Sequence, residues 1–357
     1  MEHPVEPKKH HRRPHYRGKY PRHFEEKYKE LQPEKYQREI AHVIAKGNTP
    51  AGMHIPILVN EILEILDIKP GEVGYDATLG YGGHTEKMLE QLAGRGHLYS
   101  GDVDPIEAQK TIDRLRAKGY GEDIWSFRAM NFADIDRLAA EAGPFDFVLA
   151  DLGVSSMQID DPSRGFSYKA DGPLDLRLNP EAGISAAERL ASMDREEIEG
   201  MLVENADEPF AAEIARQIVR DRRRGAQIAT TRALHAEIEA ALARVKWPKG
   251  TTPQDKKEAI KKSSARTFQA LRIDINREYE VLYRLMEKLP DALAPGGRAA
   301  ILTFHSGEDR IVKKAFQAFY RSGVYAAIAK DVIRPSAEEC RRNPRAHSTK
   351  LRWARKA

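Results

Sequence analysis

The chain has 357 residues, of which 41% are hydrophobic, a formal net charge of +4 and one cysteine, Cys340. It is long enough for two domains, or for one domain with an insertion, around a sizeable core. A single cysteine excludes an intrachain disulfide and favours a reducing compartment. No apolar run approaches the roughly 20 residues that a membrane helix needs, so we expect a cytoplasmic protein with no membrane partner.

Residues 1–33 are predicted to form a disordered basic arm. The stretch from Lys8 to Arg22 holds seven Lys or Arg and no acid, and it has too little apolar surface to fold alone. Such an arm could bind phosphate backbones or could simply keep the protein in solution, and the sequence leaves both interpretations open. Residues 34–53 are predicted to be a short helix and a linker.

The folded part is predicted to begin near residue 54, with a helix over 57–66 that Pro70 and Gly71 terminate. Segments with helical spacing then alternate with short strand-like runs. This alternation predicts a parallel, doubly wound α/β sheet. The predicted strands are residues 73–76, 97–102, 124–128 and 145–150.

A glycine-rich loop, Gly80-Tyr81-Gly82-Gly83-His84, follows the first predicted strand and opens the next helix. Backbone N–H groups in such a loop point toward a ligand. Asp102 ends the second strand 22 residues after Gly80, where a carboxylate can accept hydrogen bonds from a ribose diol. Position 85 is Thr, so the third glycine of a dinucleotide site is missing. The loop therefore favours S-adenosylmethionine over NAD, and a tight turn without a ligand is the alternative.

The pattern changes after Asp151. Residues 185–262 have helical spacing and no evident strand, which predicts a helical insertion in the sheet domain. Two basic clusters in this insertion favour a surface that faces RNA, although a solvated helix face is the usual explanation of such clusters. The clusters are Arg216, Arg220, Arg222, Arg223 and Arg224, and Lys256, Lys257, Lys261 and Lys262.

The sheet pattern returns after the insertion. A long helix is predicted over about 266–289, a strand over 298–303 and a further helix through residue 319, followed by a basic tail. The chain is thus predicted to divide into a first part of the core (54–160), a helical insertion for substrate recognition (161–265) and a second part of the core with the tail (266–357).

Seven segments occur in an order that resembles the small-subunit ribosomal RNA methyltransferase H (MraW) family. The resemblance covers about residues 54–357, with two departures: Gly307 stands where a leucine is usual, and the arm before residue 50 is longer than in most members. The segments are His54-Ile55-Pro56-Ile57-Leu58, Gly80-Tyr81-Gly82-Gly83-His84-Thr85, Asp151-Leu152-Gly153-Val154-Ser155-Ser156-x-Gln158, Arg164-Gly165-Phe166-Ser167, Asp171-Gly172-Pro173-Leu174-Asp175-x-Arg177, Arg266-Thr267-Phe268-Gln269-Ala270-Leu271-Arg272-Ile273 and Phe304-His305-Ser306-x-Glu308-Asp309-Arg310.

The resemblance implies a class I methyltransferase fold, Rossmann-like, with an inserted helical domain. It implies transfer of a methyl group from S-adenosylmethionine to the exocyclic N4 amine of a cytosine in the decoding centre of 16S ribosomal RNA. The implied partner is small-subunit RNA or the assembled small subunit. The alternatives are an amine methyltransferase that acts on another RNA or on DNA, and a non-catalytic RNA-binding assembly factor. The oligomeric state stays open, a homodimer included.

The resemblance also implies the residues that bind the cofactor. Asp102 would hold the ribose hydroxyls, an apolar ring after the third strand would cover the adenine, and the glycines would lie at the methionine and sulfonium end. The complete implied set is Gly82, Gly83, His84, Asp102, Phe132, Asp151 and Gln158.

Methyl transfer to an aromatic amine is difficult because the nitrogen lone pair is delocalised into the ring. An acceptor for the amine hydrogens would help, and Asp151 is the first candidate because it ends the fourth strand. The further candidates are Asp171, Asp175, His305 and Glu308, with a salt-bridged loop as the alternative for the first two.

Carbon methylation would need a cysteine nucleophile, and Cys340 is far in sequence from every cofactor motif, so we expect nitrogen chemistry. No residue cluster has metal-ligand spacing, and no metal is expected. A paired or stacked target base has to be turned out into the pocket, and Phe166 and Tyr168 are candidates to stack on it.

Overall fold

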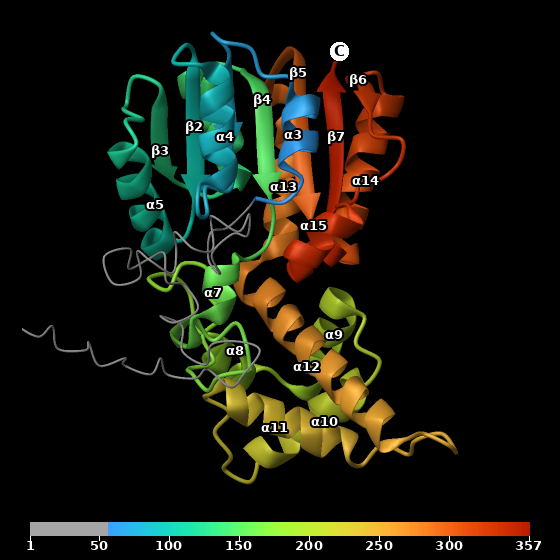
Figure 1. Cartoon of the computed structure of the whole chain (residues 1–357). Helices are drawn as coiled ribbons and strands as arrows, with labels where there is room; N and C mark the ends of the chain where they lie inside the picture. Colours follow the sequence, from blue (N-terminus) through green and yellow to red (C-terminus); the bar gives the residue numbers. More distant parts are fainter. Residues whose placement is uncertain (1–55) are drawn as a thin grey trace, which may run out of the picture. The chain divides into compact units, whose positions relative to one another are not determined.

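Within residues 56–357, the part of the chain that this computed structural model describes, seven strands form one sheet in the order β3-β2-β1-β4-β5-β7-β6 (Figure 1). The predicted basic arm and the short helix after it lie outside the described residues. The strands are β1 (Val73–Asp76), β2 (His97–Asp102), β3 (Trp125–Ala129), β4 (Phe145–Asp151), β5 (Leu293–Thr303), β6 (Tyr325–Ile328) and β7 (Lys350–Lys356).

Strands β1 to β5 are parallel to one another, as predicted. Strand β1 pairs with β2 on one side and with β4 on the other. The chain therefore reverses its strand order between β1 and β4, and ligands bind at such a switch point, beyond the carboxyl ends of the strands.

The last two strands were not predicted. Strand β7 lies between β5 and β6 and runs antiparallel to both. The prediction of a basic tail was wrong for residues 350–356, which form a strand of the sheet although four of them are Lys or Arg. Arg352 is only 7% exposed, and its guanidinium donates to Asp309 at 2.6 Å, which compensates the charge inside the fold.

Helices cover both faces of the sheet, which makes it doubly wound (Figure 1). One face packs against α3 (Val59–Leu66), α4 (Gly83–Leu92) and α5 (Pro105–Ala117). The other face packs against α6 (Ile135–Ala142), α13 (Glu278–Ala292) and α14 (Ser306–Arg321).

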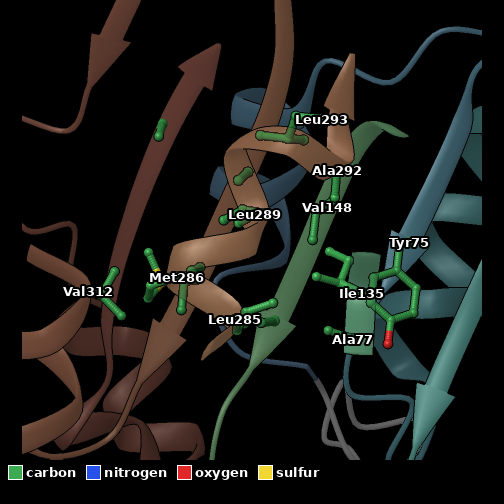
Figure 2. Packing of buried hydrophobic residues seen from close by; sticks show 14 of the residues in the cluster. Tyr75, Ala77, Ile135, Val148, Leu285, Met286, Leu289, Ala292, Leu293 and Val312 are labelled. Atoms are coloured by element: carbon green, nitrogen blue, oxygen red, sulfur yellow. The ribbon is translucent and has the colours of Figure 1, made fainter. Parts of the chain in front are cut away.

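The second face shows why α13 is a helix of the core. Leu285, Met286 and Leu289 recur at helical spacing and are at most 2% exposed. In Figure 2, Leu285 lies on the side of Val148 of β4 and Ile135 of α6, and Met286 lies beside Val312 of α14. Burial of this apolar stripe fixes α13 against the sheet, and the amino-terminal end of α13 contributes to the cavity described below.

The helices that lie between β4 and α13 have a hydrophobic core of their own. None of the helices in the described part is long and apolar enough to cross a membrane. The helices of this segment are α7 (Ser156–Asp160), α8 (Ala186–Ser192), α9 (Arg195–Ala206), α10 (Ala211–Arg222), α11 (Thr231–Leu242) and α12 (Pro253–Asn276).

The prediction of a single helix over 266–289 was wrong, because two helices, α12 and α13, occupy this stretch. Helix α12 begins earlier, at Pro253, where Thr252 and Asp255 on either side of this proline form a reciprocal capping box. It ends at Asn276. The next residue, Arg277, adopts a left-handed conformation with φ of 52°, and α13 begins at Glu278. No glycine or proline marks this break in the sequence.

Candidate active site

A cavity of about 730 Å³ lies at the carboxyl ends of β1, β2 and β4. Its walls come from the sheet domain, from the segment after β4 and from residues 343–348. All seven residues implied as cofactor ligands line it, although they come from four separate parts of the chain. They are Gly82, Gly83, His84, Asp102, Phe132, Asp151 and Gln158.

The glycine-rich loop is held tightly against its neighbours. Gly82 has a φ of 69°, and a Cβ there would lie 2.7 Å from the methyl group of Thr111. Thr111 donates to the Gly80 carbonyl at 2.6 Å, and the Gly80 N–H donates to Asp102 at 2.8 Å. Burial raises the pKa of Asp102. Each carboxylate oxygen has two lone pairs, so Asp102 can still accept a ribose hydroxyl.

Tyr81 in the same loop lines the cavity, and Arg114 of α5 contacts it. The Arg114 guanidinium lies 3.6 Å from the centroid of the Tyr81 ring and donates to the Tyr81 carbonyl. A cation over an aromatic face is attracted by the ring quadrupole. Arg114 thus holds the loop in place without lining the cavity itself.

Gln158 lines the cavity, yet its amide already bonds within the protein. The Gln158 carbonyl oxygen accepts from the Ser155 N–H at 2.7 Å, and its NH₂ group donates to Asp104 at 2.7 Å. Asp104 also accepts from Arg164 at 2.8 Å, and both of these side chains are almost fully buried. Arg164 in turn donates to the Leu178 carbonyl at 2.9 Å. This network joins the loop after β2 to the insertion.

Asp151 lies at the end of β4 with its backbone N–H donating to the Thr78 hydroxyl at 2.7 Å. Its Oδ2 is 3.6 Å from His84 Nε2. Its Oδ1 is buried and accepts no hydrogen bond from the described residues. Burial, together with the charges of Asp76 and Glu308, raises the pKa of Asp151 to about 7. A carboxyl group of this kind can take up a proton near neutral pH.

Residues 51–357 match the model of the MraW methylase family. The chain belongs to this family. It is 63% identical over 352 residues to ribosomal RNA small subunit methyltransferase H 1 of Agathobacter rectalis, with 99% of each chain covered. It is 59% identical over 346 residues to ribosomal RNA small subunit methyltransferase H 2 of Alkaliphilus metalliredigens, with 97% of each covered.

Membership of the MraW methylase family confirms the resemblance seen in the sequence. The strand order, with one antiparallel strand between β5 and β6, together with this membership confirms the class I methyltransferase fold. The predicted use of S-adenosylmethionine is confirmed with it.

Of the other residues considered for proton transfer in this methylase, Glu308 lines the cavity and His305 does not. His305 caps the start of α14, and its Nε2 is 3.2 Å from Glu308 Oε1. Burial acts to raise the pKa of Glu308, but its hydrogen bond with His305 and the charges of His305 and Arg272 hold that pKa below its usual value. Glu308 is therefore a charged neighbour of Asp151 rather than a second group that titrates near neutral pH.

Asp171 and Asp175 do not line the cavity. Asp171 is exposed and accepts from the Arg232 N–H at 3.2 Å. Asp175 receives two hydrogen bonds of 2.7 Å from Arg177, and these hold the pKa of Asp175 down even though burial acts to raise it. The salt-bridged loop that was the alternative for these acids fits Asp175, which pairs with Arg177, whereas Asp171 forms no ion pair with the described residues.

The two rings expected to stack on a target base belong to the core of the insertion. Phe166 is only 9% exposed and is packed inside that core. Tyr168 stacks on His235 at 4.5 Å between ring centroids, and neither Phe166 nor Tyr168 lines the cavity. The stacking hypothesis was therefore wrong, because both rings stabilise the insertion.

Several polar residues that line the cavity were not predicted from the sequence. Arg272 stood in a quoted motif but received no role, and it donates to Glu278 at 2.8 and 3.0 Å. Asn276 donates to the Leu176 carbonyl and accepts from the Leu178 N–H, both at 2.8 Å. The ends of α12 and α13 thus hold the insertion loop at the cavity wall.

Three of the residues near this wall could also be considered as metal ligands. Ligand atoms of Glu278, His305 and Glu308 lie within 4.8 Å of one another. However, both carboxylate oxygens of Glu278 already accept from Arg272. The arginine supplies the positive charge that a metal ion would bring, and we propose no metal there.

Proposed function

We propose that this protein transfers a methyl group from S-adenosylmethionine to the N4 amine of a cytosine in the decoding centre of small-subunit ribosomal RNA. The observation that carries the chemistry is that Asp151 lines the cavity with a side chain that is 30% exposed, while its Oδ1 accepts no hydrogen bond from residues 56–357. The names of the relatives supply the class of RNA, and such a substrate is found in the cytoplasm.

The residues around the cavity fit the cofactor. The backbone at Gly82 and Gly83 can approach a ligand closely, and Asp102 is placed at the strand end where a ribose diol is accepted. Ionised Asp151 and Glu308 would favour the positive charge of a sulfonium. The bound cofactor supplies the electrophilic methyl group.

Asp151 would act on the amine rather than on the cofactor. A hydrogen bond from the N4 amine to the Asp151 carboxylate favours the pyramidal form, in which the nitrogen lone pair is available. The nitrogen then bonds to the methyl carbon as the carbon–sulfur bond breaks, and the amine proton passes to Asp151. Alignment of the reacting atoms in the cavity would supply much of the rest of the rate.

The position of the one cysteine supports nitrogen rather than carbon as the acceptor. Cys340 lies in helix α15 (Ala337–Arg342), packs against the core of the sheet domain and does not line the cavity. A carbon methyltransferase that attacks the pyrimidine ring would need this thiol beside the base.

The helical segment between β4 and β5 would recognise the RNA, as the division at residues 161–265 predicts. Its loop at residues 177–179 forms one wall of the cavity. A base turned into the cavity would thus lie between this loop and the sheet domain.

The test uses purified protein, S-adenosylmethionine and small ribosomal subunits that lack the modification. Digestion of the RNA and mass spectrometry of the nucleosides should reveal N4-methylcytidine. In single turnovers at saturating cofactor, Asp151→Asn should slow transfer by about 10² to 10⁴. Asp171→Asn is the matched control, because this acid lies outside the cavity and should leave the rate unchanged.

Other products would decide against the proposal. A methyl group on carbon or on another base would overturn the assignment of the N4 amine. Tight binding of the cofactor without any transfer would support a non-catalytic assembly factor.

A further inference from the structure

Helix α12 reaches from the cavity to the far end of the insertion (Figure 1). Arg272, Ile275 and Asn276 in its last turns line the cavity. The helix has 24 residues, so its first residue lies about 35 Å from its last. Whatever the start of α12 contacts is therefore well beyond the reach of a single nucleotide in the cavity.

Four lysines surround the start of α12. Lys246 and Lys249 lie in the preceding loop, and Lys256 and Lys257 lie in the first turns of the helix. All four are exposed, and none forms an ion pair with any of residues 56–357. We call residues 246–257 the α12 tip.

The acids near the α12 tip do not neutralise these lysines. Asp255 accepts from the Thr252 N–H at 2.9 Å and from the Thr252 hydroxyl at 2.7 Å as the cap of the helix. Glu258 faces Lys261 at 3.5 Å and Lys262 at 3.9 Å. The α12 tip therefore keeps a local excess of positive charge, which suits a phosphate backbone.

The loop of the α12 tip is anchored rather than loose. Trp247 packs on Phe210 at 5.5 Å between ring centroids. Lys256 also approaches this ring, with its Nζ 6.0 Å from the Trp247 ring centroid. The tryptophan thus ties the loop to α10 and holds the lysines at one end of α12.

The arginine cluster at the end of α10 differs from the α12 tip in this respect. Arg220 donates to Asp221 at 2.9 Å. Arg222 donates to the carbonyls of Leu190 and Met193 at 2.5 and 2.7 Å. Arg220 and Arg222 therefore hold the insertion together, whereas all four lysines of the α12 tip are exposed and form no ion pair with the described residues.

We propose that the α12 tip binds the phosphate backbone of a second segment of the substrate RNA, about 35 Å from the target base. This inference rests on the proposed function, since it takes the substrate to be RNA. The inference adds a requirement for the substrate: the RNA must be folded, and it must be large enough to contact the cavity and the α12 tip at the same time. A short stem-loop that carries the target base would not satisfy it.

The test compares two double variants with a control of equal charge. Lys256→Ala/Lys257→Ala changes the helix end of the tip, and Lys246→Ala/Lys249→Ala changes its loop. Lys69→Ala/Arg95→Ala is the control, since these exposed cations precede β1 and β2, at the sheet edge opposite the cavity. Alanine favours the helix at positions 256 and 257, so that variant should fold.

Binding is measured against salt concentration for complete small-subunit RNA and for a stem-loop shorter than α12. Each tip variant should lower the slope of log K against log salt by about two for the complete RNA, or about one for each lysine. For the stem-loop, the tip variants should leave this slope unchanged. The affinity for S-adenosylmethionine should also stay the same. The control variant should match the unaltered protein on both RNAs.

The inference is overturned if the unaltered protein methylates the RNA and the tip variants bind complete RNA like the control. It is also overturned if both RNAs lose affinity equally, because the tip would then contact the target segment itself. Failure of methylation by the unaltered protein, with the salt slopes as expected, would reject the proposed chemistry and retain the RNA contact.

Discussion

The ring of Tyr279 occupies the space that a side chain at position 307 would need. A Cβ on Gly307 would lie 2.7 Å from Cζ of the Tyr279 ring. The Tyr279 hydroxyl donates to the Asn205 carbonyl at 3.1 Å, at the end of α9. The glycine that departs from the family resemblance thus makes room for a link between α9 of the insertion and the start of α13.

Gly307→Leu should therefore displace Tyr279 and break this link. We expect a loss of about 1 to 3 kcal/mol in the free energy of unfolding, as for other overpacked sites. Tyr279→Ala alone should also destabilise the protein, but Gly307→Leu/Tyr279→Ala should cost less than the sum. Denaturant unfolding of the four proteins measures this coupling, and simple additivity would show that the two positions are independent.

Among substitutions outside the cavity, Arg164→Met should cause one of the largest losses in the free energy of unfolding. It leaves the buried carboxylate of Asp104 without its cation, which typically costs 3 to 5 kcal/mol, so we expect a loss of about that size. Arg116→Met is the control, because Arg116 and Glu122 form an exposed pair worth at most about 1 kcal/mol. Equal losses in the two variants would contradict this account of the network.

Asp151 should make the stability of the protein depend on pH. Burial and the charges of Asp76 and Glu308 raise its pKa to about 7 in the folded protein. The folded state therefore binds this proton more tightly than the unfolded chain does, and the free energy of unfolding falls as pH rises from about 4 to about 7. The side chain is 30% exposed, so water moderates the effect to the order of 1 to 3 kcal/mol.

This dependence can be checked by unfolding the protein at about pH 5 and about pH 8. Asp151→Asn should reduce the difference in stability between the two conditions, whereas the exposed Asp171→Asn should not. In the same window the rate of methyl transfer should rise with pH, because only the ionised carboxylate can accept the amine proton. A rate that falls as pH rises through 7 would exclude Asp151 as the acceptor.

Arg114→Ala should weaken binding of S-adenosylmethionine although Arg114 does not line the cavity. The substitution removes the cation that holds the Tyr81 ring and its carbonyl. A contact of this kind is worth about 0.5 to 2 kcal/mol, which corresponds to roughly a 2- to 30-fold rise in Kd. Calorimetry can measure this change. The control is Arg116→Ala, two residues along the same helix and exposed, and an equal change in both would reject the positioning role.

The sequence predicted the parallel half of the fold because its signals are local. Short apolar runs such as Phe145–Asp151 end on acids, and helical spacing separates them. The cofactor loop was predictable for the same reason, since Gly80, Gly82 and Gly83 stand in one short stretch. Parallel strands end at one edge of a sheet, so the residues at those ends were expected to meet.

The missed parts depend on partners far away in the chain. Strand β7 looks like a basic tail until Arg352 is paired with Asp309, 43 residues earlier. The break between α12 and α13 depends on a left-handed Arg277, which no turn-forming residue announces. Neither feature follows from propensity, because tertiary contacts decide both.

The acids considered for proton transfer could not be told apart from the sequence for the same reason. Asp175 and Glu308 both stand in motifs, and the sequence gives no reason to separate them. In the fold, Asp175 is neutralised by Arg177 outside the cavity, whereas Glu308 lines it. Which acid faces the ligand depends on side-chain pairing, which becomes visible only in three dimensions.

The place of β7 also bears on how the chain is assembled during synthesis. Strand β6 leaves the ribosome before β7, yet it touches the sheet only through β7. Until residues 350–356 have emerged, β5 has an open edge and β6 has no strand to pair with. An unpaired edge strand invites association with other chains. A nascent or truncated chain that lacks β7 should therefore be prone to aggregation, even though every residue that lines the cavity has already been made.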